Sequence, residues 1–185
     1  SGLIHNQEAT QKLLYLAGKG LPSTYIPGII AGVTGPITPA GSMAIGNAGA
    51  LTGLVLSQLK AQGAPFIIPG RGGFALDMKT MLNCYCLPDS IGLAASLARY
   101  YNLPTFGLGG CSDSKMVDQQ SAAEASLTLI TESIGGINLI HDMGYLESGL
   151  CGSLAQLVIC NEIVSWIKRY LSQIEISQET LAVDL

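Results

Sequence analysis

The stretch TFGLGGCSDSKMVDQQSAAEASLTLITESIGGINLIH, residues 105–141, decides the fold. It begins with a short uncharged run, residues 105–109, and ends with a second apolar run, residues 137–141. Residues 117–133 lie between them, have the composition of a helix, and are followed by two glycines. A strand, a helix and a strand in this order predict two parallel strands joined by a right-handed crossover.

The same unit recurs on both sides of this stretch. Asn6 and Gly20 are typical of the start and the end of a first helix, which no strand precedes. Strand starts at about residues 26, 66, 105 and 137 give a spacing of roughly 30 to 40 residues, which is typical of a parallel sheet. The remaining elements that we predict are strands over residues 25–33 and 66–69, and helices over residues 39–61, 89–101 and 149–171, with Thr38 and Asp89 as caps.

Both ends of this pattern lie inside a strand–helix unit, since residues 174–176 and 177–179 suggest another unit where the sequence stops. We therefore expect one α/β domain over residues 1–185, built of parallel (β/α) units and cut within a unit at both ends. Four units make about half of a (β/α)8 TIM-type barrel, which usually needs about 250 residues. The competing architecture is a complete four-stranded doubly wound sheet.

The composition excludes several classes of protein. Hydrophobic residues make up 48% and charged residues 12%, and thirteen acidic against nine basic residues give a net charge of −4. These values exclude a disordered chain, a basic nucleic-acid-binding surface and a polybasic membrane arm. Residues 20–59 carry no charge, but four prolines interrupt them, so we expect a buried strand and helix there and no membrane span. Five cysteines, an odd number, and the lack of a signal peptide predict a reducing, cytoplasmic location.

The loops after the predicted strands hold the candidate functional residues, because the sites of both architectures lie at the carboxyl ends of the strands. Seven of the 22 charged residues fall in these loops: Arg71, Asp77, Asp113, Lys115, Asp118, Asp142 and Glu147. The residues that we select as catalytic are Asp113, His141 and Glu147. Those that we select for binding substrate are Arg71, Phe74, Lys115 and Tyr145.

Each candidate also has a purely structural interpretation. Asp113 or Ser114 would cap the following helix, and Lys115 would pair with Asp118 in its first turn. His141 would be a core histidine, and Arg71, which lies among glycines, would sit in a solvated turn instead of holding a carboxylate or phosphate. Cys84 and Cys86 are spaced as metal ligands can be, but we predict no metal site, because the chain has only two histidines.

Several longer motifs carry a family resemblance over nearly the whole chain. They are residues 35–41 (GPITPAG), 47–48 (NA), 58–59 (QL), 63–65 (GAP), 110–115 (GCSDSK) with Asp118 and Gln120, 138–142 (NLIHD), 144–147 (GYLE), 156–158 (QLV) and 161–162 (NE). In these motifs the chain resembles the trimethylamine methyltransferase family.

The resemblance implies a (β/α)8 barrel that transfers a methyl group from a methylated amine to the cobalt of a corrinoid (cobalamin). A partner protein carries the corrinoid, so this chain would bind none directly. One branch of the family uses pyrrolysine; the sequence contains none, which favours the branch acting on quaternary amines such as glycine betaine. We expect a corrinoid protein and a small methylated amine as partners, a homo-oligomer, and no nucleic acid or membrane.

A quaternary ammonium has no hydrogen to donate, so proteins hold it with aromatic faces and with acids at a distance. Tyr145 and Phe74 are the loop aromatics for this purpose, and Asp113 and Glu147 are the counter-charges. Arg71 or Lys115 would take the carboxylate of a betaine. Two other functions stay open: a metal-assisted barrel lyase that uses Asp113, His141 and Glu147, and an inactive oligomeric fragment.

Overall fold

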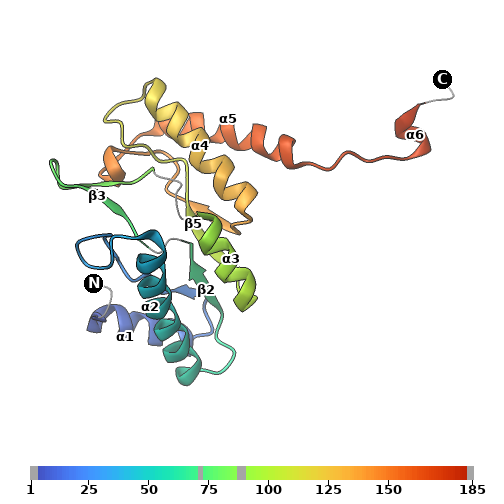
Figure 1. Ribbon diagram of the computed structural model, residues 1–185. Helices are drawn as coiled ribbons and strands as arrows, with labels where there is room; N and C mark the ends of the chain where they lie inside the picture. The colour runs from blue at the N-terminus through green and yellow to red at the C-terminus, as the bar shows by residue number, and fades with distance from the viewer. Residues whose placement is uncertain (1–3, 71–72, 87–90, 183–185) are drawn as a thin grey trace.

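The computed structural model describes residues 4–70, 73–86 and 91–182, with the side chains of residues 91 and 92 excepted. The helices are α1 Gln7–Gly18, α2 Pro39–Lys60, α3 Ile91–Tyr101, α4 Gln119–Gly135, α5 Leu154–Leu171 and α6 Gln178–Leu181, with a 3₁₀ turn η1 Glu147–Gly149 (Figure 1). The strands are β1 Ser23–Thr24, β2 Phe66–Pro69, β3 Ala75–Asp77, β4 Leu82–Cys84, β5 Thr105–Leu108, β6 Leu139–His141, β7 Tyr145–Leu146 and β8 Cys151–Gly152.

Four parallel strands form the main sheet, in the order β1-β2-β5-β6. Each strand therefore pairs with the next strand of that sheet along the chain. The register places Ile68 opposite Thr105 and Gly107 opposite Ile140. Because side chains alternate along a strand, these four residues share one face of the sheet, and Phe106, Leu139 and His141 share the other.

The helices pack on the first of these two faces. Phe66 and Ile68 contact Leu13 of α1 and Ala98 of α3 in one buried cluster. Ile140 packs against the cluster formed by α4 and α5, which includes Leu129 and Ile163. A doubly wound sheet would carry helices on both faces, so this arrangement does not fit the competing architecture.

The second face of the sheet is partly open. Leu139 is 49% exposed there, and Phe106 and His141 are half-buried. The antiparallel pair β3–β4 extends from the body of the molecule near this face, and the chain after α5 runs away from the body to α6 (Figure 1). The carboxyl edge of this open face carries the site described below.

Side-chain caps start most of the helices, as the sequence predicts for α1 and α2. Asn6 accepts a hydrogen bond from the Ala9 amide, and Thr38 accepts one from Gly41. Asp118 caps α4 through a reciprocal pair of hydrogen bonds with Ser121, so the assignment of this cap to Asp113 or Ser114 is wrong. Asp89, the predicted cap of α3, lies outside the described residues.

The glycines of α2 allow the chain before it to pack directly on the helix backbone. A Cβ atom at position 49 would lie 2.7 Å from Pro27 Cβ, and one at position 53 would overlap Tyr25. By length and composition α2 resembles a membrane-spanning helix. Its buried glycine face instead indicates a core helix.

Two predictions of secondary structure need correction, and two strand pairs were missed. No strand forms over residues 25–33. The two-residue β1 lies before this segment, and only isolated bridges form at Ile30 and Ala31, because Pro27 lacks the amide that a ladder needs. The helix predicted from residue 149 starts at Leu154, after η1 and β8. The antiparallel pairs β3–β4 and β7–β8 were not predicted at all.

Candidate functional site

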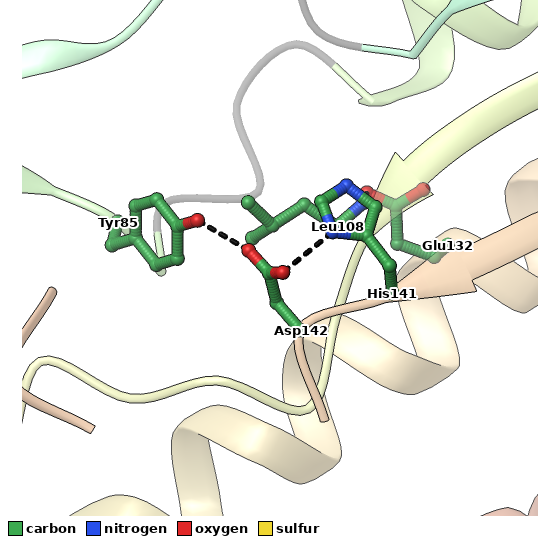
Figure 2. Close-up of polar contacts among 5 residues, drawn as sticks. All are labelled: Tyr85, Leu108, Glu132, His141 and Asp142. Carbon is green, nitrogen blue, oxygen red and sulfur yellow. Dashed lines mark hydrogen bonds and ion pairs between the residues drawn. The ribbon is translucent and has the colours of Figure 1, made fainter. Parts of the chain in front are cut away.

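His141 ends β6, and its imidazole is held by the next residue in the chain. The Nδ1 atom of His141 lies 2.6 Å from Oδ1 of Asp142. Since an ionised carboxylate only accepts, Nδ1 carries the hydrogen and Nε2 is left for another partner. Tyr85, just after β4, donates its hydroxyl to the other oxygen of Asp142 (Figure 2).

Two aromatic stacks lie on either side of this carboxylate. The ring of Phe106 in β5 stacks on His141 with centroids 4.0 Å apart and planes 8° apart. The ring of Phe74 stacks on Tyr85 with centroids 6.0 Å apart. Asp142 therefore joins two ring pairs that come from three different segments of the chain.

The backbone of the loops fixes this arrangement. Asp142 has φ 72°, in the left-handed region, and Gly144 follows at 88°. The amide of Gly109 donates to His141 O at 3.0 Å, and that of Gly144 donates to Gly110 O at 3.1 Å. The loops after β5 and β6 are thus joined to each other immediately beside the site.

Glu132 of α4 supports β5 from the helix-covered face. Its carboxylate is buried and accepts a hydrogen bond from the Leu108 amide at 3.2 Å. Position 107 has to be glycine, because a Cβ there would overlap that carboxylate. Figure 2 shows Glu132 behind His141, where it supports the strand that carries Phe106.

Asp113 lies in the loop after β5, and its carboxylate is used by neighbouring segments. It accepts hydrogen bonds from the amides of Tyr85 at 3.0 Å and Cys86 at 3.4 Å, and from the Ser148 hydroxyl at 3.1 Å. Its own amide donates to Glu124 at 2.8 Å. Asp113 therefore holds the segment that carries Tyr85; its catalytic role stays a prediction.

Glu147 and Lys115 meet at the outer rim of these loops. Their charged groups are 3.6 Å apart, with Lys115 mostly exposed and Glu147 about one-third exposed. Lys115 thus pairs with Glu147, and the predicted partner Asp118 is bound to Ser114. Tyr145 is 42% exposed in β7, and Arg71 lies outside the described residues.

Three of the predicted site residues have partners of their own. His141 bonds to Asp142, Asp113 to the amides after β4, and Glu147 to Lys115. Within residues 4–70, 73–86 and 91–182, no group of three His, Cys, Asp or Glu side chains is placed to hold a metal ion. This arrangement gives the metal-assisted lyase no support from the described residues.

The sequence interpretation did not select Tyr85, Asp142 or Phe106 as site residues. Asp142 was recognised only as a charged loop residue, although its place directly after a strand-ending histidine was an available signal. Tyr85 follows a short hairpin strand that no pattern predicted, so nothing in the sequence placed it here. A hollow of about 390 Å³ between α1 and residues 24–28 contains none of these groups.

Comparison with known proteins agrees with the resemblance described above. The model of the family described as trimethylamine methyltransferase (MTTB) matches residues 1–185. The trimethylamine methyltransferase MttB of Desulfitobacterium hafniense is 36% identical over 181 residues, which are 96% of this chain and 36% of that protein.

Of two further relatives, one bears the same name and the other a different one. The MttB protein of Methanosarcina thermophila is 34% identical over 180 residues, 95% of this chain and 37% of the relative. A glycine betaine methyltransferase of Desulfitobacterium hafniense is 30% identical over 161 residues, 85% of this chain and 33% of the relative. The chain thus spans about a third of the length of the curated relatives it matches. Because the family model covers all 185 residues, the chain belongs to the trimethylamine methyltransferase family.

Proposed function

We propose that this chain is part of an enzyme that moves a methyl group from a quaternary or tertiary methylamine to the cobalt of a corrinoid protein. Membership of the family supports methyl transfer as the reaction class. The observation that carries the proposal is the pair of aromatic stacks around Asp142, because a methylated ammonium is attracted by ring faces and by a nearby carboxylate. Glycine betaine is the first substrate to test, and trimethylamine is the second.

The residues of the site suit such a substrate. A methylated ammonium leaves as a neutral amine once its methyl group has been transferred, so the reaction needs no strong acid at the nitrogen. What it needs is a fixed position for the methyl group and the exclusion of water. The rings of Phe74, Tyr85 and Phe106 supply apolar faces, and Asp142 supplies the opposite charge. His141, whose Nδ1 atom bonds to Asp142, adds its imidazole ring beside Phe106.

The corrinoid, when its partner protein carries it to the site, supplies the reduced cobalt that accepts the methyl group. The role of this chain is to bind and orient the amine on the open face of the sheet. His141 and Phe106 lie on that face, and His141 ends β6 at its carboxyl edge. That edge is where barrel enzymes assemble their sites.

We further propose that the fold is about half of a (β/α)8 barrel. The strands pair in chain order and the helices contact one face, as they do around a barrel. Among the described strands, β1 and β6 are the edges, and unpaired edges recruit other strands. We therefore expect a homo-oligomer, or further strands of the same protein, to complete the sheet, and a cytoplasmic location.

The test mixes the full-length protein with cob(I)alamin or its corrinoid protein and one amine at a time. The amines are glycine betaine, carnitine, proline betaine and trimethylamine, and the absorption spectrum follows methylcobalamin. Formation of methylcobalamin with a quaternary amine is the expected result. Turnover of trimethylamine alone would overturn the substrate preference, and no transfer from any of the four would overturn the proposed reaction.

A further inference from the structure

Two cysteines that the proposed reaction does not use contact each other beside the site, next to Tyr85 and near Asp113 in the chain. Cys86 follows β4 and Cys111 follows β5, and their sulfur atoms are 3.8 Å apart. The Cys86 thiol also donates to the Cys111 carbonyl oxygen at 3.1 Å. Cys86 is 6% exposed and Cys111 is fully buried, and both are free thiols.

The two segments that carry these thiols are already fastened together. Asp113, two residues after Cys111, accepts hydrogen bonds from the amides of Tyr85 and Cys86. Leu108 packs against both cysteines, and Tyr85 covers this cluster. A disulfide has an S–S distance of about 2.05 Å, so the sulfurs would approach by a distance that side-chain rotation and a small backbone shift supply.

The other three cysteines differ from this pair. Cys160 is equally buried, but its thiol donates to the Gly110 carbonyl oxygen at 3.1 Å. Cys84 is half-buried, and Cys151 is exposed. Among the described residues, which include all five cysteines, Cys86 and Cys111 form the one hydrogen bond between two thiols.

We propose that Cys86 and Cys111 are a redox-sensitive pair that closes to a disulfide when the protein meets a disulfide oxidant. The two thiols lose two protons and two electrons, one S–S bond forms, and the S–S bond of oxidised glutathione breaks to give two reduced glutathione molecules. A stronger thiol reductant reverses the exchange. The new bond links the end of β4 to the loop after β5.

The disulfide would act on the site through Tyr85. This residue directly precedes Cys86, and its hydroxyl donates to Asp142, which orients His141. A covalent bond at Cys86 adds to the hydrogen bonds from the Tyr85 and Cys86 amides to Asp113 that already hold this segment. The oxidised protein therefore has a more rigid connection between β4 and the His141–Asp142 pair.

The rate of closure depends on pH. The hydrogen bond to Cys111, and burial after it, raise the pKa of the Cys86 thiol above its ordinary value. Since the thiolate is the form that attacks a disulfide, the pair closes slowly at neutral pH. We expect the rate to rise by about tenfold for each pH unit while the Cys86 thiol remains mostly protonated.

Peptide mapping tests this proposal on the full-length protein. The protein is incubated with oxidised glutathione, and its free thiols are blocked by an alkylating agent under denaturing conditions before digestion. The expected product is a peptide pair joined between Cys86 and Cys111 that dithiothreitol separates. Recovery of both cysteines in alkylated form, or of Cys111 joined to Cys160, would overturn the proposal.

Matched variants separate this pair from the other thiols. Cys160→Ser and Cys151→Ser should leave the cross-linked peptide in place, and Cys86→Ser should abolish it. The oxidised wild-type protein should also melt at a higher temperature than the reduced protein, because the bond restricts the unfolded chain. Neither the peptide map nor the melting temperature depends on methyl transfer. Failure of this proposal can therefore be told apart from failure of the proposed function.

Discussion

His141 and Asp142 are neighbours in the chain whose side chains also bond to each other, at 2.6 Å between Nδ1 and Oδ1. The contact requires Asp142 to adopt φ 72°, which costs free energy for any residue with a Cβ atom. A backbone conformation of this kind, directly after a strand that ends in histidine, persists because the surrounding loops hold it. It directs the imidazole toward Phe106 on the open face of the sheet.

Asp142→Gly should separate the orientation of His141 from the stability of the loop. Glycine adopts the left-handed conformation without strain, so we expect the melting temperature to be kept. The transfer rate should fall by about tenfold, which corresponds to about 1.4 kcal/mol. His141→Ala should give a similar loss, and rates of methylcobalamin formation measure both. Unchanged rates, together with a lower melting temperature, would mean that His141 is only a core residue.

Tyr85→Phe removes the hydroxyl that donates to Asp142 and keeps the ring on Phe74. A hydrogen bond to a charged group contributes about 1.5–3 kcal/mol, so the rate should fall by about ten- to a hundredfold. Tyr15→Phe is the control, since Tyr15 is exposed on α1. Nitrogen-15 NMR of the two histidines, with His5 as internal reference, should show the hydrogen of His141 less firmly fixed on Nδ1. Equal spectra for the variant and wild type would contradict this role for Tyr85.

Asp113→Ala should reduce both stability and transfer. The Tyr85 and Cys86 amides lose their acceptor, and an unsatisfied half-buried donor costs about 1–3 kcal/mol. Because the same segment carries Tyr85, the rate should fall by about tenfold, or about 1.4 kcal/mol. Denaturant unfolding and the transfer assay measure the two effects. Asp77→Ala, in the exposed β3–β4 turn, is the control that leaves the site in place.

Gly53→Ala should destabilise the protein although alanine favours helices more than glycine does. The added methyl group would overlap Tyr25, and overpacking of this kind costs about 1–3 kcal/mol. Gly28→Ala is the matched control, because no described atom lies within 4 Å of a Cβ placed there. A Gly53→Ala protein as stable as wild type in denaturant would show that Tyr25 does not pack on α2 in this way.

The buried thiols make stability depend on pH at the alkaline end. The hydrogen bond to Cys111 and burial raise the pKa of Cys86, and burial raises the pKa of Cys160. The stability that these two thiols give the folded protein is fully present below the ordinary thiol pKa of 9.0. It is lost as the pH rises above 9.0, because the unfolded chain then releases protons that the folded chain keeps. We expect the free energy of unfolding to fall above pH 9.0 by about 1.4 kcal/mol per pH unit for each thiol.

Cys86→Ser should reduce that slope, whereas Cys151→Ser, which changes an exposed thiol, should keep it. Equilibrium unfolding under reducing conditions at several pH values measures the difference. A slope that is the same in all three proteins would show that the buried thiols titrate freely in the folded state.

The sequence predicted those elements whose signals are local. The bounds of β2 agree with the prediction to the residue, and Asn6 and Thr38 cap their helices as expected. The spacing of apolar residues along the sequence does not reveal contacts between residues that are far apart in the chain. Tyr85 and Asp142, which bond to each other, are 57 residues apart. The predicted strand over residues 25–33 failed for a related reason: the segment is apolar because it packs on the glycines of α2, and Pro27 prevents it from pairing.

The sequence predicted where His141, Asp113 and Glu147 lie, but not the partners that they contact. His141 lies at the carboxyl edge of the sheet as expected, because strand ends are visible in the sequence. Asp113 and Glu147 lie in the expected loops, but their nearest partners come from segments that the sequence could not align. Family membership added the reaction class, which no single residue indicates.

The two hydrogen-bond partners of Asp142 lie at very different distances along the chain: His141 is adjacent, and Tyr85 is 57 residues away. The bond of Asp142 to His141 encloses no helix or strand, whereas its bond to Tyr85 encloses α3, β5, α4 and β6. Closing a longer loop costs more entropy, so the histidine is oriented early in folding and the tyrosine arrives late. Partial opening of the hairpin would then release Tyr85 and leave the imidazole aligned. Hydrogen exchange should accordingly find the amide of Tyr85 less protected than the amides of β5 and β6.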